Sequence, residues 1–567
     1  MTKRKKHQIT EYEKCLREYH KTSPRHVIVL EADLPEDEKR HLFHQADLLR
    51  QCGNELLGIM KRNLDQLLRT KKYRGLRKSY GKISKSIKNL QQIKKLSNVQ
   101  KRHLKDLQKD LRTVGDQMKE IQKTYHVTWE YCRNTMKTLR LKYEQTSVIA
   151  LSRAEDIWTA VSKVLYSDGE RLHFKKRGDL SELRAKQFHK EIIGRVKNGF
   201  LEFRYGKVSL PVIKKETDLW LMNELEAVES YLKDPDFHDA YAINQMQQGE
   251  IVSTYRPCYA SIVCKTIRGK LRVYLHLTVE GLSFSKRTND GIIKHPYGNG
   301  PVGCDIGTQT IAYTSDHTVG LENLAERGNS ICCVERWQRL VQRTMDRSRR
   351  AMNPNNYNDD GTIRKGKKTW IKSKRYQKLQ LRYRELCRIS AENRRLAIHE
   401  QVHKMRSLGD IFVTEAKNAK KLQKRANPEN PLDKNGRPKR KKRFGRSIQN
   451  RCPGYFQAKV KQLFESTGGT YIEVPSDYRA SQYDHTVDDY IKKKLSQRMY
   501  NLKDGTKVQR DWYSSFLLYC IDLITKTIDR QKCLATFETQ LNKEHAMIEE
   551  IIHLKKHIMN SGIRVAV

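Results

Sequence analysis

The residues from Pro301 to Tyr313 constrain the fold of this chain more than any other stretch. An apolar run ends on one carboxylate, Asp305, and Gly307 then allows a tight turn into a second apolar run that includes Ile311. This pattern predicts two strands joined by a turn, with a carboxylate at the end of the first strand. Such a carboxylate either caps the turn or serves as an oxygen ligand for a metal ion that meets a phosphate group.

Two further carboxylates stand at the ends of expected elements. The apolar run from Ile411 to Thr414 predicts a strand that ends on Glu415, and the residues from Arg510 onward predict an amphipathic helix with Asp511 in its first turn. Taken singly, each has an ordinary explanation, because strand-end carboxylates are readily solvated and acidic residues suit helix N-termini. Together, three carboxylates at element ends are what a two-metal nuclease site needs.

The charge balance indicates a polyanionic partner. Lys and Arg total 112 against 65 Asp and Glu, which gives a formal net charge of +47. An excess of this size repels itself unless nucleic acid neutralises it. The sequence has no apolar run of ~18 residues and no apolar segment of a signal peptide near its start, so we expect no membrane partner. The twelve cysteines are scattered without a CxxC pair, which favours a reducing compartment.

The length of 567 residues predicts several domains. Residues 1–35 are predicted to contain a loose basic arm at 1–24 and then a first strand around Val27 to Leu30. Residues 36–186 are predicted to be helical, with an apolar stripe from Leu42 to Met60 and a heptad seam from Leu104 to Tyr125. The seam favours a long helical hairpin that lies on a nucleic-acid backbone, and a coiled-coil dimer also fits it.

The period of the pattern changes to two from about residue 190. Residues 187–297 are predicted to form a β-barrel or a small antiparallel sheet with a helical insert near 215–245. A linker at 288–300 marks a domain boundary. Beyond it, the residues from Ile331 to Val334 are expected to be a strand, and those from Arg336 to Arg350 a helix that breaks at Asn353-Pro354 before another long helix.

Three stretches resemble the RuvC-like nuclease motifs of TnpB proteins and type V CRISPR effectors. In chain order they are GCDIGTQTIAYT, which contains Asp305, IFVTEAKNAKKL, which contains Glu415, and RDWYSSFLL, which contains Asp511. Similarity at the level of motifs covers roughly residues 300–525, and the rest of the chain is similar in layout only. The resemblance implies a multidomain α+β protein with an RNase H-like (RuvC) α/β domain, an antiparallel β-barrel wedge domain and a helical recognition lobe.

The resemblance also implies domain boundaries and chemistry for the remaining chain. Residues 298–482 would be the RuvC-like domain with its first two motifs, 483–509 an insert that loads the target nucleic acid, and 510–567 the third motif and a helical tail. Asp305, Glu415 and Asp511 are implied as the catalytic ligands of two Mg²⁺ ions. The implied activity is cleavage of target DNA directed by a guide RNA, in the prokaryotic cytoplasm at the nucleoid, by a monomer or a dimer.

The chain departs from many relatives in one interval. Those relatives carry a four-cysteine zinc site ahead of the third motif, whereas here no cysteine lies between Cys452 and Cys520. We therefore expect no zinc. The interval is expected to hold a Lys-rich helix from Asp488 to Met499 and a hairpin from Leu502 to Val508.

Basic side chains near the motifs are the expected nucleic-acid contacts. Arg510, beside Asp511, either steadies the scissile phosphate or forms a structural salt bridge. Other contacts are expected from the helix after Arg336 and from a loop at 417–446, for which a nuclear localisation signal is the alternative interpretation. The residues are Arg343, Arg347, Arg349, Arg350, Lys439, Arg440, Lys441, Lys442 and Arg443.

Three classes of function remain open. The first is an RNA-guided nuclease, and the second is a guided DNA-binding protein that represses or assists a transposon without cutting. The third is an actin-like kinase built on the stretch from Asp305 to Thr308. The kinase gives no reason for the charge of +47 or for Glu415 and Asp511 in their contexts. The complete set of three carboxylates favours the nuclease over the repressor.

Overall fold

A computed structural model describes residues 10–91, 97–167, 169, 171–186, 191–197, 200–250, 252–288, 290–326, 330–416, 445–475, 478–492 and 496–565. The chain divides into two compact units, Met1–Phe284 and Ser285–Val567, and the division lies just ahead of the predicted linker. Both units combine helices with sheets, so the chain is a multidomain α+β protein. Among the described residues, no helix is both long enough and apolar enough to cross a membrane.

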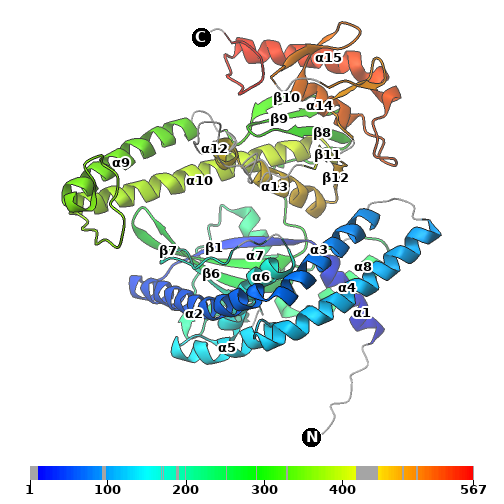
Figure 1. Cartoon of the computed structure of the whole chain (residues 1–567). Helices are drawn as coiled ribbons and strands as arrows, with labels where there is room; N and C mark the ends of the chain where they lie inside the picture. The colour runs from blue at the N-terminus through cyan, green and yellow to red at the C-terminus, as the bar shows by residue number, and fades with distance from the viewer. Residues whose placement is uncertain are drawn as a thin grey trace. The chain divides into compact units, whose positions relative to one another are not determined.

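Five helices of the first unit pack around one apolar core. The predicted stripe in the first of them is buried, as at Leu56 and Met60. The predicted helical hairpin is present as α3 and α4, which lie side by side (Figure 1), and Met118 of the heptad seam is buried in the same core as Tyr73. The five helices are α2 (Glu36–Arg69), α3 (Lys71–Gln91), α4 (Asn98–Thr124), α5 (Trp129–Lys142) and α6 (Ser147–Tyr166).

Two antiparallel sheets complete the first unit, with strand orders β1-β7-β6-β2 and β3-β4-β5. An isolated bridge between Ala32 and Val212 links β1 to the segment after β5, and both sheets contribute to one core. The first strand and the helical insert are confirmed, whereas a closed barrel stays a prediction. The elements are β1 (Arg25–Ala32), β2 (Glu182–Ala185), β3 (Ile192–Lys197), β4 (Phe200–Tyr205), β5 (Val208–Ser209), α7 (Leu219–Lys233), α8 (Pro235–Gln247), β6 (Pro257–Ile267) and β7 (Lys270–Glu280).

The prediction of a loose arm before the first strand is wrong, because this segment contains the helix α1 (Glu11–Thr22). The Thr10 side chain accepts a hydrogen bond from the amide of Glu13, and the Glu13 side chain accepts one from the amide of Thr10. This capping box starts the helix. The Tyr19 hydroxyl donates to the Val252 carbonyl at 2.7 Å and anchors it. The prediction relied on the basic and polar composition of the segment and overlooked the T-x-x-E capping pattern of Thr10 and Glu13.

A five-stranded sheet with the order β10-β9-β8-β11-β12 forms the centre of the second unit. β8, β9 and β10 are antiparallel neighbours, and β11 runs parallel to both β8 and β12. Figure 1 shows the sheet between helices, with α10 and α13 packed in the core of one face and α14 and α15 in the core of the other. The strands are β8 (Pro301–Ile306), β9 (Thr310–Thr314), β10 (Val319–Asn323), β11 (Ile411–Glu415) and β12 (Thr470–Val474).

The other elements of the second unit precede or follow these strands. α9 and α10 pack along each other as a long pair (Figure 1), and the predicted break at Asn353-Pro354 lies between them. The elements are α9 (Ser330–Met352), a 3-10 turn (Pro354–Asn356), α10 (Lys374–Leu408), α12 (Gly445–Arg451), α13 (Pro453–Ser466), β13 (Tyr483–Asp484), β14 (Asp489–Tyr490), β15 (Met499–Asn501), β16 (Lys507–Gln509), α14 (Arg510–Tyr519) and α15 (Arg530–His553).

Two predicted elements of this unit are wrong. The strand predicted from Ile331 to Val334 is the start of α9, and β10 is the third strand of the sheet instead. Val334, Val341 and Met345 recur at helical spacing, so the helical period extends back through this segment. The Lys-rich helix predicted at 488–499 is not observed either, because the described part of that segment contains β14 and the start of β15.

Candidate functional site

Two of the predicted carboxylates lie on neighbouring central strands. In the parallel pair of β8 and β11, Thr414 is opposite Cys304, so Glu415 follows at the level of Asp305. Side chains alternate between the two faces of a sheet. Cys304 and Phe412 belong to the core under α10 and α13. Asp305 and Glu415 therefore lie on the opposite face, which α14 covers, and both are partly buried.

α14 crosses this face in direct contact with β8. A β-carbon added to Gly303 would lie 2.2 Å from both the carbonyl oxygen of Ser515 and the amide nitrogen of Tyr519. Only glycine permits so close an approach between a helix and a strand. Thr314, which is opposite Gly303 in β9, has its hydroxyl oxygen 2.8 Å from that of Ser515. The middle of α14 is thus fixed over the residue that precedes Asp305 on the same face.

The direction of α14 places Asp511 at the same end of the sheet as Asp305. The Tyr519 hydroxyl donates to Asp316 Oδ1 at 2.6 Å, and Asp316 follows β9 at the level where β8 begins. Because Ser515 lies over the middle of β8, the first turn of α14 lies toward the other end of that strand. The structure therefore brings the three predicted carboxylates to one end of the sheet, from two strands and one helix.

A guanidinium group faces the carboxylate of Asp511. Arg498 Nη1 lies 3.4 Å from Asp511 Oδ1, and the Asp511 side chain is only 17 % exposed. The amide of Arg510 donates to the Arg498 carbonyl at 2.9 Å, which ties the start of α14 to the end of the segment before β15. Sequence reasoning missed Arg498 because it assigned this segment to a helix. Only the pairing of β15 with β16 brings the residue here.

A buried carboxylate holds the residue that caps α14. Gln509 Oε1 accepts from the amide of Trp512 at 2.7 Å, and the amide of Gln509 donates to Glu544 Oε1 at 3.0 Å. Glu544 is fully buried, and burial raises its pKa to about 7. Sequence reasoning missed Glu544, although its place on the stripe of Met547 and Ile551 in α15 was a usable signal.

Glu415 has a buried phenol as a neighbour. The Tyr478 hydroxyl donates to the Leu517 carbonyl of α14 at 2.5 Å. Burial raises the pKa of Tyr478, and the negative charge of Glu415 adds to that effect. The segment after β12 is thereby held against α14, close to the end of β11.

The donor chemistry of the three carboxylates suits Mg²⁺, a hard cation that takes oxygen ligands. In the part of the chain that the structure describes, however, no group of three His, Cys, Asp or Glu side chains is arranged to hold a metal ion. The three carboxylates share one end of the sheet without forming a closed set of ligands, and Arg498 lies beside Asp511. Metal binding at this site therefore stays a prediction.

Residues 483–509 contain two hairpins, one of them at the predicted place near Leu502 to Val508. His485 lies in the turn between β13 and β14, within an aromatic cluster. Its Nδ1 is 2.7 Å from the Tyr513 hydroxyl oxygen, and its ring centroid is 4.4 Å from that of Phe537. Burial lowers the pKa of His485. The expectation that the chain binds no zinc stays a prediction.

The predicted contact arginines of α9 form two groups. Arg343 and Arg347 are exposed and lie on one stripe of the helix. Two others fold onto the turn between α9 and α10, with guanidinium carbons 5.2 Å from aromatic ring centroids, Arg349 over Trp370 and Arg350 over Tyr357. Further predicted contacts fall outside the described residues, namely Lys439, Arg440, Lys441, Lys442 and Arg443.

The comparison with solved structures gives a weak likeness. No protein-family model and no curated protein matches the chain. Among the solved structures that match is the crystal structure of a selenomethionine-derived Cas12i1 R-loop complex before target DNA cleavage, with 10 % sequence identity and a TM-score of 0.24. The match covers 79 % of this chain and 58 % of the length of that one. A likeness of this strength carries no argument about function.

Proposed function

We propose that this protein is an RNA-guided DNA endonuclease of the TnpB and type V kind, with an RNase H-like (RuvC) nuclease domain in its second unit. The observation that carries the proposal is the placement of Asp305, Glu415 and Asp511 at one end of a five-stranded sheet. The sheet order, an antiparallel meander followed by two parallel strands, supports the RNase H-like assignment. The assignment to the TnpB and type V family rests on the resemblance of the three sequence motifs.

The proposed reaction is hydrolysis of a phosphodiester bond in DNA. Asp305 and Glu415 present oxygen atoms from adjacent strands, and Asp511 adds a third carboxylate from the first turn of α14. The positive end of that helix favours the approach of an anionic phosphate. When bound at these oxygens, two Mg²⁺ ions supply Lewis-acid activation of the attacking water and of the leaving oxygen. In this proposal Arg510 contacts the phosphate, and Arg498 balances the charge of Asp511.

The proposed guide is an RNA that neutralises the basic excess of the chain. The net charge is +47, and binding to a polyanion relieves the self-repulsion of such a charge by releasing condensed counterions. In this assignment the guide pairs with the target DNA, and the protein recognises the shape of the heteroduplex and a short adjacent motif.

The carboxylates are tested by comparing two substitutions in the protein expressed with its native flanking DNA. Asp305→Ala should abolish DNA cleavage in Mg²⁺ while guided DNA binding stays nearly unchanged, because the substitution removes an oxygen ligand and leaves the phosphate contacts. Glu465→Ala is the matched control, since Glu465 is an exposed carboxylate on α13 that pairs with Lys461. Undiminished cutting by Asp305→Ala would refute the assignment of the site.

The guide is tested by sequencing the RNA that copurifies with the protein. We expect one dominant species, encoded beside the gene, with a variable segment that directs cutting. A random sample of cellular RNA, with no effect on DNA cleavage, would leave only an unguided basic nuclease.

A second candidate is a guided DNA-binding protein that does not cut. Two observations favour it: Arg498 lies against Asp511, and no three-residue metal group is present among the described residues. The same experiments decide between the candidates. If the protein carries a dominant guide and binds its target tightly but cleaves nothing in Mg²⁺, the second candidate is correct.

A further inference from the structure

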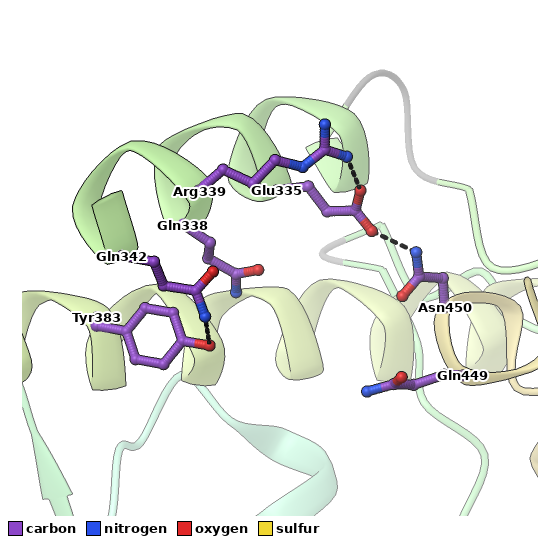
Figure 2. A pocket seen from close by; sticks show the side chains of 7 residues that line it. All are labelled: Glu335, Gln338, Arg339, Gln342, Tyr383, Gln449 and Asn450. Carbon is purple, nitrogen blue, oxygen red and sulfur yellow. Dashed lines mark hydrogen bonds and ion pairs between the residues drawn. The ribbon is translucent and has the colours of Figure 1, made fainter. Parts of the chain in front are cut away.

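A polar pocket lies between α9, α10 and α12, and none of the three carboxylates is among its described lining residues. Its volume is about 420 Å³. Four lining residues come from α9 at spacings of three and four, so they share one face of that helix. Figure 2 shows these side chains directed toward one another and toward the residues from the other two helices. The lining residues are Glu335, Gln338, Arg339, Gln342, Tyr383, Gln449 and Asn450.

Hydrogen bonds within the pocket orient its side chains. Gln342 Nε2 donates to the Tyr383 hydroxyl at 2.7 Å. Glu335 accepts from Arg339 at 3.1 Å and also from the carboxamide of Asn450. The helix that carries Gln449 is held to α10 because Arg394 Nη1 donates to the Gln449 carbonyl at 2.9 Å. These bonds bring carboxamides from two helices to one cavity.

The remaining donors and acceptors of the carboxamides are open to a ligand. A carboxamide offers two donors and an acceptor oxygen. Among the described residues, no partner donates to the side-chain oxygens of Gln338 and Gln342, and the carboxamide of Gln449 makes no hydrogen bond. The pocket thus presents several neutral hydrogen-bonding groups together with the ring of Tyr383.

This lining selects one kind of ligand by elimination. An anion is disfavoured because the single cation, Arg339, is paired with Glu335. Among the described lining residues, Glu335 is the only carboxylate, which disfavours a metal ion, and none is aliphatic, which disfavours an apolar ligand. The volume falls within the range of small-ligand pockets, about 300–1,000 Å³. A flat, neutral molecule with donors and acceptors on its edge matches all of these features.

Arginines on the neighbouring stripe of α9 supply contacts for phosphate groups. Arg336, Arg343 and Arg347 are exposed. Their stripe is rotated by roughly 100° about the helix axis from the face that lines the pocket, which corresponds to an offset of one residue. A single strand whose phosphates follow these arginines has its bases within reach of the pocket. Unpaired bases are bound in this way elsewhere, by hydrogen bonds to their edges and by aromatic side chains.

We propose that this pocket binds one unpaired nucleobase of the nucleic acid that the protein carries, with adenine preferred. A Gln or Asn carboxamide pairs with adenine through one donor and one acceptor, N6 and N7. The inference rests on the nucleic-acid binding in the proposed function but not on cleavage. The base belongs to either RNA or DNA, since both present the same adenine edge.

The test measures the affinity of the full-length protein, freed of bound nucleic acid by high salt, for labelled homopolymers. The probes are oligo(rA), oligo(rU), oligo(dA) and oligo(dT) of about 15 nucleotides, a length that spans one typical single-strand site. Fluorescence anisotropy in EDTA reads binding without cleavage. We expect the adenine probe to bind about 5- to 100-fold more tightly than the pyrimidine probe, the discrimination of one or two good base contacts.

Substitutions separate base contacts from phosphate contacts. The double variant Gln338→Leu with Gln342→Leu should lose the adenine preference and keep the salt dependence of binding. Arg343→Gln with Arg347→Gln should weaken all probes alike and reduce the salt slope by about 0.7 for each phosphate that is no longer neutralised. Gln377→Leu on the exposed surface of α10 is the matched control, because Gln377 does not line the pocket.

Each outcome decides the proposal. An adenine preference in the RNA pair alone assigns the base to RNA, and a preference in the DNA pair alone or in both pairs extends it to DNA. Equal binding of adenine and pyrimidine probes by the wild type, or a preference that survives both Gln338→Leu/Gln342→Leu and Gln449→Leu, overturns it. Because binding is measured in EDTA, which prevents metal-dependent cleavage, the absence of nuclease activity would not affect the test of the base pocket. A failure of the base-pocket proposal would likewise leave the proposed nuclease activity to its own test.

Discussion

Glu544 Oε1 accepts a hydrogen bond at 3.0 Å from the backbone amide of Gln509, the residue that caps the helix with Asp511 in its first turn. A fully buried carboxylate on α15 thus holds the start of α14. The other oxygen, Oε2, is 3.6 Å from Nε2 of His545, which is mostly exposed. The position of Asp511 consequently depends on a group whose pKa is raised to about 7 by burial.

Glu544→Gln should change the pH dependence of stability. The native state binds more protons than the unfolded state between the ordinary pKa of Glu, about 4.3, and the native value near 7. The free energy of unfolding therefore falls as the pH rises through this window. The glutamine keeps the acceptor oxygen and does not titrate. At pH 8 the free energy of unfolding of the variant should therefore be about 1–3 kcal/mol higher than that of the wild type.

Denaturant unfolding followed by tryptophan fluorescence at pH 5 and pH 8 measures this difference, with buried Trp512 of α14 as one reporter. The two proteins should be similar at pH 5, where Glu544 is protonated. The same difference at both pH values would show that burial does not hold this carboxyl group protonated.

Gly303→Ala should uncouple α14 from β8. The new methyl group would meet backbone atoms of Ser515 and Tyr519 at 2.2 Å, so the helix has to shift. Such overpacking costs about 1–3 kcal/mol. A shift of α14 moves Asp511 relative to Asp305, so cleavage should fall far more than nucleic-acid binding. Gly81→Ala is the control, since nothing lies within 4 Å of its β-carbon. Normal cleavage by Gly303→Ala would contradict the contact between α14 and β8.

Arg498→Gln should lower the Mg²⁺ concentration needed for half-maximal cleavage. The guanidinium lies 3.4 Å from Asp511 Oδ1 and competes with a cation for that carboxylate. A partly exposed pair of this kind contributes about 0.5–1 kcal/mol, which corresponds to a two- to five-fold change. Lys503→Gln, at an exposed position in the same insert, should leave the requirement unchanged. A higher Mg²⁺ requirement in Arg498→Gln would mean that Arg498 orients Asp511 for the metal.

Purified protein should contain well under one zinc ion per chain. Zinc sites take four Cys or His ligands, and His485 already has its Nδ1 at 2.7 Å from the Tyr513 hydroxyl oxygen. Elemental analysis before and after treatment with a chelator checks this expectation. One zinc per chain that is released only on unfolding would overturn it.

In two basic segments the secondary structure predicted from charge and residue pattern is wrong. Residues Glu11–Thr22, before β1, form a helix whose start is stabilised by the capping box of Thr10 and Glu13. The segment from Asp488 to Met499 contains strand residues because it takes part in two hairpins, in which Asp489 pairs with Asp484 and Met499 pairs with Gln509. Helix propensity is a weak preference that such cross-strand pairing overrides.

Local patterns in the amino-acid sequence are enough to predict the periodic elements and the order of the carboxylates along the chain. The strand before Asp305, the strand that ends on Glu415 and the helix that begins beside Asp511 all follow from apolar residues at neighbouring positions. That these three carboxylates lie at the same end of the sheet follows only from the folded chain, because it requires the parallel register of β8 with β11 and the packing of α14 on Gly303. The contacts of Arg498 with Asp511 and of Glu544 with Gln509 could also not be predicted from the sequence, because contacts between separate elements produce no periodic pattern of residues.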